Sequence, residues 1–393
     1  MNPFAPQPIY SSAYVQMYAG RRKGELEPHL FAIAEEAYRA MLREDRDQTI
    51  ICSGESGAGK TVSAKYIMRY FATVDDPDRP SKRKAARDAS GMTQVEQQIL
   101  ATNPIMEAFG NAKTTRNDNS SRFGKYIEIL FDASQTIIGA RIRTYLLERS
   151  RLIYQAETER NYHIFYQLLA GAPASDRDSL GLGDVSKFHY LSQGGAGAAR
   201  IDKVDDAAEF AATQKALSTV GITSERQWQI FGVLAALLHL GNIAITASRN
   251  DAVLADDEPS LVLACRLLGI APAEFKRWTV KKQITTRSEK IVTGLSAPQA
   301  LVVRDSVAKY IYSCLFDWLV AVTNESLASD GLDSRVKRFI GVLDIYGFEF
   351  FSASGGREGG LTRAEKNSFE QFCINYANEK LQQEVRQLAP RRD

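Results

Sequence analysis

The residue types and their spacing at positions 54–61 could bind a polyphosphate. These residues read Gly-Glu-Ser-Gly-Ala-Gly-Lys-Thr and match the pattern G-x-x-x-x-G-K-[ST] of a phosphate-binding loop. Glycines let successive backbone N–H groups face the phosphates, and the start of a following helix adds positive potential. We expect the Lys60 ammonium to lie between the β- and γ-phosphates and the Thr61 hydroxyl to bind Mg²⁺. The nucleotide contacts predicted in this loop are Gly54, Glu55, Ser56, Gly57, Ala58, Gly59, Lys60 and Thr61.

A phosphate-binding loop needs a strand before it and a helix after it, and the flanking residues predict both. The short apolar run at residues 49–53 is typical of a buried parallel strand, and a helical pattern covers residues 61–73. Residues 339–345 form a second apolar run, and residues 126–132 and 137–147 indicate a hairpin. Further helices are expected at residues 161–169, 207–220, 228–240, 300–324 and 368–382, and loops at residues 75–91 and 352–360. Strands that alternate with helices predict an α/β fold, here a P-loop NTPase with a mixed, largely parallel central sheet flanked by helices.

Composition and charge exclude several classes of protein. The chain of 393 residues is 44% hydrophobic and 24% charged, which is ordinary for a globular protein and long enough for two or more subdomains. Its formal net charge is +2, so the overall charge gives no reason to expect nucleic acid as a partner. The longest apolar stretch, at residues 231–245, is interrupted by polar residues, so we expect no membrane span and a soluble, intracellular protein.

Cysteine and histidine are set aside as catalytic or metal-binding groups. The cysteines are scattered without a C-x-x-C pair, which favours reduced, buried thiols and no zinc site. They are Cys52, Cys265, Cys314 and Cys373. His163 and His239 lie in apolar helical contexts, where a buried structural histidine is more common than a catalytic one.

Two further motifs decide among the many families that use such a loop. Residues 117–125 read NDNSSRFGK, and residues 344–349 read DIYGFE at the end of the second apolar run. Together with the loop, these motifs resemble switch I and switch II of the myosin motor family, whereas kinesins carry related motifs with different tails. The resemblance also implies that residues 103–115 and 146–169 are helices flanking the site and that residues 368–382 begin the relay helix.

The resemblance implies a metal site and a purine site. In myosins, residues matching Thr61 and Ser121 hold Mg²⁺, and the residue matching Asp344 lies near the metal, usually through water. The residues that resemble the purine-holding loop are Asn2, Pro3 and Tyr10. ATP and Mg²⁺ are therefore the expected cofactors.

The resemblance also assigns roles in hydrolysis. The residue matching Ser120 helps to position the attacking water, Asn117 braces the phosphates, and Gly347 offers its backbone N–H to the γ-phosphate. Arg122 and Glu349 resemble the pair that forms a salt bridge when the two switches close. The residues expected to act in catalysis are Lys60, Ser120, Arg122, Gly347 and Glu349.

Partners, location and class follow from the same resemblance. The expected partner is the actin filament, in the cytoplasm and the actin cytoskeleton as part of a myosin complex. Residues 305–309 match D-x-x-A-K, and Glu289 lies 16 positions before residue 305, where myosins place an acidic or phosphorylatable residue in an actin-facing loop. Residues 188–195 and 287–293, together with Tyr346, favour a fungal class V heavy chain.

The resemblance covers only part of a motor. Residues 1–150 match the nucleotide-binding core with the purine loop, P-loop and switch I, residues 151–335 a mostly helical upper actin-cleft subdomain, and residues 336–393 the switch II strand and a truncated relay helix. We find no match to the lower actin-binding subdomain, the converter, the lever arm or a light-chain-binding segment, which predicts an N-terminal-half fragment. Two functions stay open: Mg²⁺–ATP hydrolysis coupled to actin binding, or nucleotide binding by a fragment without productive turnover. An unrelated P-loop kinase or GTPase is disfavoured because it would not carry the SSRFGK and DIYGFE pair. GTP binding would also usually need a guanine-reading motif such as NKxD, which the sequence lacks.

Overall fold

The computed structural model describes residues 5, 7–55, 57–74, 94–195, 197–285, 289–328, 331–349 and 369–388. The loops predicted at residues 75–91 and 352–360 lie outside the described residues. Within these ranges, no helix is both long enough and apolar enough to cross a membrane.

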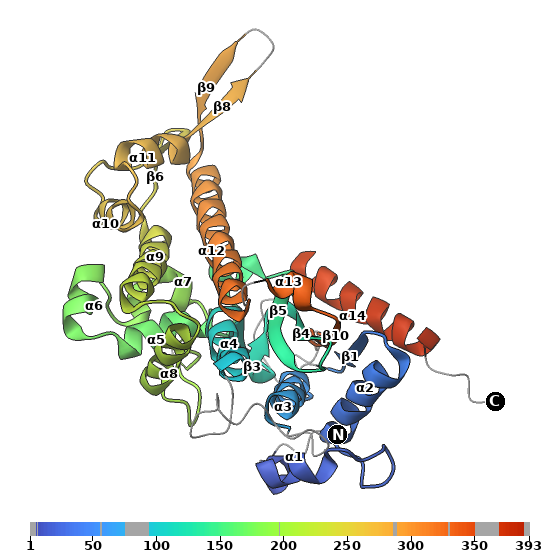
Figure 1. The fold of residues 1–393 in the computed structure, drawn as a ribbon. Coiled ribbons are helices and arrows are strands. Elements are labelled where there is room, and N and C mark those ends of the chain that lie inside the picture. The colour runs from blue at the N-terminus through green and yellow to red at the C-terminus, as the bar shows by residue number, and fades with distance from the viewer. Residues whose placement is uncertain are drawn as a thin grey trace, which may run out of the picture.

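A four-stranded mixed sheet lies at the centre of the fold (Figure 1). Its strands, in order across the sheet, are β1 (Gln48–Cys52), β10 (Arg338–Asp344), β4 (Gly124–Phe131) and β5 (Ile137–Tyr145). β1 runs parallel to β10, whereas the β10–β4 and β4–β5 pairings are antiparallel. The mixed α/β arrangement is confirmed, but the parallel share is smaller than predicted, at one pairing of three in the described sheet. The predicted hairpin explains part of the difference, because a short turn can join only antiparallel neighbours.

One face of this sheet packs against helices. The helices are α2 (Leu30–Glu44), α3 (Lys60–Thr73), α4 (Gln94–Gly110) and α12 (Ala297–Leu327). Ile127 and Ile129 are two residues apart in β4, so their side chains point to the same face of the sheet, the one covered by these helices. α2 and α3 pack in the core that contains Ile129, and α3, α4 and the end of α12 pack in the core that contains Ile127. On the opposite face, the described residues form a small cluster of Leu130, Ile138 and Leu332.

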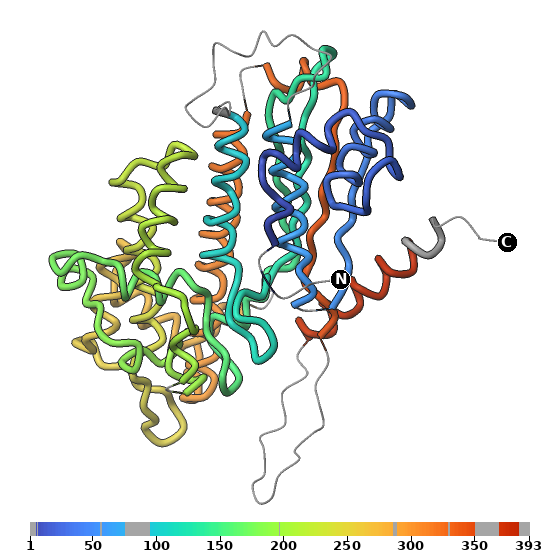
Figure 2. The backbone as a smooth tube through the Cα atoms, turned by 90° about the horizontal axis from the view of Figure 1, so that it is seen from below, coloured from blue at the N-terminus to red at the C-terminus, as the bar shows by residue number. Residues whose placement is uncertain are grey.

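Most other helices gather in a second part of the molecule. They are α5 (His163–Gly171), α6 (Ala174–Leu180), η4 (Val185–Lys187), α7 (His189–Ser192), α8 (Asp206–Thr219), α9 (Ser224–Asn242), α10 (Pro259–Leu268) and α11 (Pro272–Val280). α9 is buried along most of its length and forms the middle of this part. Figure 2 shows α4 and α12 side by side between this helical part and the sheet.

The remaining described elements connect or flank these two parts. They are η1 (Pro8–Tyr10), α1 (Ser12–Tyr18), β2 (Asn111–Thr114), β3 (Asn117–Ser121), η3 (Arg149–Leu152), β6 (Thr246–Ser248), β7 (Asp251–Val253), β8 (Lys281–Thr285), β9 (Lys290–Gly294), α13 (Leu332–Arg335) and α14 (Phe369–Leu388). The β8–β9 hairpin projects from the far end of α12 (Figure 1), and all of its strand residues are exposed.

Two of the expected helices have different bounds from those predicted. The helix expected at residues 103–115 ends at Gly110, because residue 111 begins the β2–β3 hairpin. Gly110 packs directly against the Phe123 ring, where a Cβ atom would clash. The helix expected at residues 146–169 begins only at His163, since the preceding residues form η3 and an irregular segment with buried ion pairs.

The cysteines were expected to be reduced and buried. All four are free thiols, as predicted, but only Cys265 is buried. Cys314 is exposed on α12, and Cys52 and Cys373 are partly exposed, so the prediction of burial was wrong for three of the four.

Candidate nucleotide-binding site

The predicted phosphate-binding loop connects β1 to α3. Gly57 and Gly59 have φ angles of 81° and 87°, in the left-handed region that side chains other than glycine rarely adopt. Lys60, the first residue of α3, turns its Nζ atom back over the loop and donates to the carbonyl oxygens of Gly54 and Glu55 at 2.8 and 2.6 Å. Burial lowers the pKa of Lys60, although nearby acidic groups act in the opposite direction.

The three residues expected at the metal meet next to this loop. The Thr61 hydroxyl donates to Asp344 Oδ1 at 3.2 Å and lies 3.3 Å from the Ser121 hydroxyl. These residues come from the start of α3, the end of β10 and the end of β3. The convergence follows from the central sheet, where the end of β1, the end of β10 and the start of β4 lie side by side. α3 follows β1 through the loop, and β3 ends just before β4.

This cluster fits Mg²⁺. Asp344 is 2% exposed, and its Oδ2 atom has no hydrogen-bond partner within the described part of the chain. The Lys125 ammonium lies 3.4 Å from that oxygen. Two hydroxyls and one carboxylate give only hard oxygen donors, which Mg²⁺ prefers. Mg²⁺ usually fills its remaining coordination positions with water and phosphate oxygens. Among the described residues, no group of three His, Cys, Asp or Glu side chains is arranged for a different metal.

Arg122 and Glu349, predicted to pair when the switches close, are in contact. Arg122 Nη2 donates to Glu349 Oε2 at 3.2 Å, and Arg122 Nη1 donates to Glu349 Oε1. Nη1 also donates to the Ser120 hydroxyl at 3.1 Å. Arg122 is fully buried, and although burial alone would lower its pKa, neighbouring carboxylates raise it well above the ordinary value. A bidentate salt bridge therefore joins the two predicted switch motifs.

Gly347 and Asn117 were also predicted to act at the phosphates. Gly347 is buried between the metal-site aspartate and Glu349, and its neighbour Phe348 makes a parallel backbone bridge with Glu55. Asn117 begins β3, and its side-chain oxygen accepts a hydrogen bond from the Asn119 backbone at 3.0 Å.

Tyr10 lies beside α3 in the expected purine region. Its ring stacks on that of Tyr66, with 3.7 Å between centroids and 9° between planes. The other residues predicted to hold the purine, Asn2 and Pro3, lie outside the described part of the chain, as does Ser56 of the loop.

Comparison with known proteins decides the family. Residues 1–389 match the sequence model of the family described as "Myosin head (motor domain)". This chain belongs to the myosin head family. It is 61% identical over 387 residues to Myosin-2 of Saccharomyces cerevisiae (strain ATCC 204508 / S288c), which covers 98% of this chain and 23% of that protein.

Two further relatives show the breadth of the match. Myosin-52 of Schizosaccharomyces pombe is 54% identical, and unconventional myosin-Vc of Homo sapiens is 49% identical; each match covers 98% of this chain, and 24% and 20% of those proteins. The chain thus spans about a quarter or less of the length of the curated relatives it matches. The predicted family is confirmed, whereas the assignment to a fungal class V myosin is not confirmed and stays a prediction.

Sequence reasoning missed several residues that contact the predicted switch residues. Gln371 and Asn375 of α14 hold Glu349, since Gln371 Nε2 donates to Glu349 Oε2 at 2.6 Å and the Asn375 side chain bonds to its backbone. Glu148 and Arg151 form buried ion pairs beside Arg122. The three-residue spacing of the latter two in LLERSR was visible in the sequence, but nothing local linked it to Arg122.

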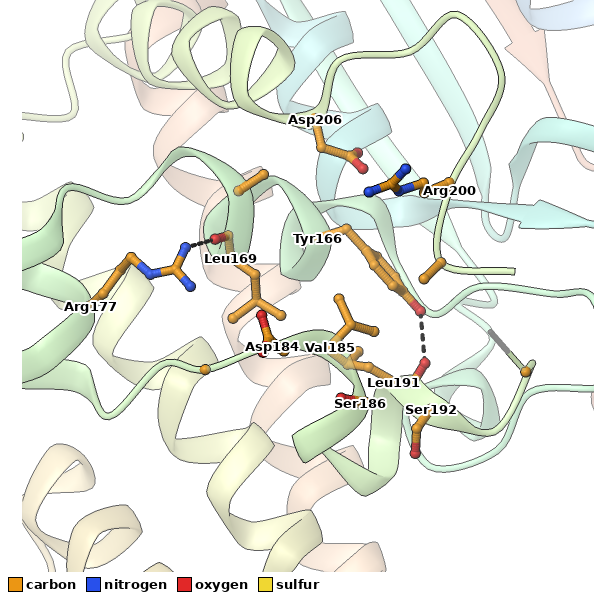
Figure 3. Close-up of a pocket in the computed structure, with 14 residues that line it drawn as sticks. Tyr166, Leu169, Arg177, Asp184, Val185, Ser186, Leu191, Ser192, Arg200 and Asp206 are labelled. Atoms are coloured by element: carbon orange, nitrogen blue, oxygen red, sulfur yellow. Dashed lines mark hydrogen bonds between the residues drawn. The ribbon is translucent and has the colours of Figure 1, made fainter. Parts of the chain in front are cut away.

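A separate cavity of about 580 Å³ opens in the helical part of this myosin chain. Tyr166, Leu169, Arg177, Arg200 and Asp206 are among its lining residues (Figure 3). None of the predicted nucleotide, metal or catalytic residues lines it. The cavity is therefore separate from the candidate nucleotide site.

Proposed function

We propose that this chain binds Mg²⁺–ATP at the loop of residues 54–61 and hydrolyses the γ-phosphate. The observation that carries the proposal is the meeting of Thr61, Ser121 and Asp344 beside the loop, with the Arg122–Glu349 pair joining the switches. Family membership supports the same reaction, since residues 1–389 match the myosin motor domain.

In this proposal, the loop and its lysine bind the phosphates. Lys60 exchanges the carbonyl oxygens of Gly54 and Glu55 for β- and γ-phosphate oxygens, which its positive charge favours. The Thr61 and Ser121 hydroxyls would hold the metal, with the Asp344 carboxylate beside them. When bound, Mg²⁺ supplies neutralisation of the charge that spreads over the β- and γ-phosphate oxygens.

The switch residues orient the attacking water. Ser120 is held by Arg122 Nη1 at 3.1 Å, so its hydroxyl has a fixed direction from which to position water. Gly347 offers a backbone N–H where a side chain would obstruct the γ-phosphate. The Arg122–Glu349 pair closes the site and couples it to α14, which holds Glu349 through Asn375.

The wider proposal follows the family. We assign residues 1–150 to the nucleotide-binding core, 151–335 to the upper actin-cleft part, and 336–393 to switch II and the relay helix. The actin filament is the proposed partner and the cytoplasmic actin cytoskeleton the proposed location. The exposed β8–β9 hairpin supports an actin-facing role, because Glu289 directly precedes β9.

The test is Mg²⁺–ATP hydrolysis by the purified chain, with and without filamentous actin. Lys60→Ala should lower turnover by about 100-fold or more, since it removes a charge from the phosphate site. Lys276→Ala is a matched control, because Lys276 pairs with Asp256 away from the site. Stimulation by actin supports the partner. Binding of Mg²⁺–ADP without turnover would refute hydrolysis and favour a fragment that only binds nucleotide.

A further inference from the structure

Arg122 touches a second carboxylate besides that of Glu349. Its Nε atom donates to Glu148 Oε2 at 2.6 Å, whereas Glu349 contacts the other two nitrogens. Arg122 is fully buried and the Glu148 side chain is 8% exposed, so water cannot readily replace this contact.

The two carboxylates are attached to different parts of the fold. The Glu148 backbone N–H donates to the Arg122 carbonyl oxygen at 2.9 Å, and its own carbonyl accepts from the Tyr162 hydroxyl at 2.6 Å. Glu349 is attached to α14 instead, through two hydrogen bonds of 2.9 and 2.6 Å with Asn375. A movement of α14 relative to the sheet would therefore carry Glu349 away and leave Glu148 in place.

Glu148 also links Arg122 to a second arginine. The same Oε2 atom accepts from Arg151 Nε at 2.6 Å, and Arg151 Nη1 donates to Glu159 Oε2 at 3.0 Å. Burial opposes ionisation of Glu148, but the charges of Arg122 and Arg151 outweigh it and lower the pKa of Glu148 to about 2. Glu148 is therefore ionised at neutral pH whether or not Glu349 is in contact.

We propose that Glu148 is a positioning residue that keeps Arg122 oriented while Glu349 leaves and returns. A buried guanidinium with no carboxylate partner is unfavourable in free energy. Without Glu148, each opening of the Arg122–Glu349 pair would therefore leave Arg122 buried without a carboxylate partner. With Glu148 in place, the orientation of Arg122 and of its partner Ser120 is kept ready for closure. This inference rests on the proposed ATPase site, because closure has a purpose only if a γ-phosphate is bound there.

A purely structural ion pair would behave differently. Loss of a purely structural ion pair would lower the fraction of folded protein, but each folded molecule would still close normally. A positioning role predicts normal binding of Mg²⁺–ADP but impaired formation of the closed state with Mg²⁺–ADP and vanadate, which imitates the γ-phosphate during transfer. Thermal unfolding with each ligand separates the two without requiring turnover.

The experiment compares Glu148→Gln with wild type and with Glu128→Gln. Glu128 is a matched control, because its side chain is 7% exposed and lies between Arg141 and Arg143 away from the site. We expect Glu148→Gln to retain the rise in melting temperature given by Mg²⁺–ADP, to lose most of the additional rise given by vanadate, and to show a kcat about 10- to 100-fold lower at similar KM. Glu128→Gln should keep both rises and its kcat per folded molecule.

A second variant, Glu148→Asp, keeps the inference testable if Glu148→Gln does not fold. Glu148→Asp keeps the charge but withdraws it by one methylene group, so we expect a partial loss of the vanadate effect. If wild type gains no stability from Mg²⁺–ADP, the proposed function fails and this inference with it. If wild type responds to both ligands and the Glu148 variants respond equally, the inference is overturned while the proposed function stands.

Discussion

Replacing Glu349 by glutamine should uncouple nucleotide binding from hydrolysis. The change removes one negative charge from the contact in which Arg122 Nη1 and Nη2 meet the two carboxylate oxygens. Glutamine keeps one acceptor, and Glu148 stays in contact with Arg122. The loss is therefore less than the complete removal of a partner from a buried ion pair.

The expected loss of free energy in Glu349→Gln follows from the burial of this contact. A hydrogen bond to a charged group contributes about 1.5–3 kcal/mol. The Glu349 side chain is 15% exposed, so water screens it partly and we take about 2 kcal/mol. If that energy is available only in the closed state, kcat falls about 30-fold. Because Glu349 contacts Arg122 and α14, the affinity for Mg²⁺–ADP should stay within about 3-fold of wild type.

The assay pairs steady-state ATPase with displacement of a fluorescent ADP analogue. Glu379→Gln is the control, since Glu379 is an exposed residue of the same helix, α14. An unchanged kcat in Glu349→Gln would show that the pair is only structural. An equal loss of ADP affinity and kcat would show that Glu349 supports the loop rather than its closure.

Three further changes test other parts of the site. Gly59→Ala places a side chain at φ 87° and should cost roughly 1–2 kcal/mol of stability and abolish nucleotide binding. Gly24→Ala, at φ 97° with open space around it, should lower stability similarly but leave binding intact. Thermal unfolding and ADP titration measure the two effects. Asp344→Asn should raise the Mg²⁺ concentration for half-maximal hydrolysis by about 10-fold, whereas Asp333→Asn on an exposed side chain should not, as read from a Mg²⁺ titration. Burial lowers the pKa of His163 to about 3, so the neutral form is favoured in the fold; its contribution to stability is fully present above the unfolded pKa of about 6.5 and is lost as pH falls toward 3, at up to about 1.4 kcal/mol per pH unit. His163→Gln should flatten the dependence of melting temperature on pH between 7 and 5, and an unchanged slope would contradict the assignment.

Local pattern was enough to predict the elements that carry the site. The apolar run at residues 49–53 became β1, the helical pattern after the loop became α3, and the run at residues 339–345 became β10, each within about two residues. β10 and one side of α3 are buried, as expected of an apolar strand and an amphipathic helix. β1 was expected to be buried, but it is the edge strand of the described sheet and its residues are only partly buried or exposed. The β2–β3 hairpin was missed, because NAKT and NDNSS lack the alternating apolar residues that mark a strand.

Contacts between distant segments were less accessible. The pairing of Arg122 with Glu349 was predicted from the family resemblance, but Glu148 was not. No periodicity connects the LLERSR segment to switch I; the contact depends on how β5 leads into η3 and returns beside Arg122. The same holds for Tyr66 under Tyr10, because a tyrosine on a helix predicts burial and does not specify which ring it meets.

The register of the central sheet explains why three distant motifs form one site. Cys52 of β1 is opposite Asp344 of β10, which in turn is opposite Lys125 of β4. Because β1 and β10 are parallel and β4 is antiparallel, this row joins the ends of the first two strands to the start of the third. The predicted phosphate loop, switch II and switch I motifs therefore lie at the same end of the sheet. A slip of one residue in β10 would turn Asp344 to the other face of the sheet and away from Thr61, so the register that pairs β10 with β1 and β4 also places this carboxylate beside Thr61.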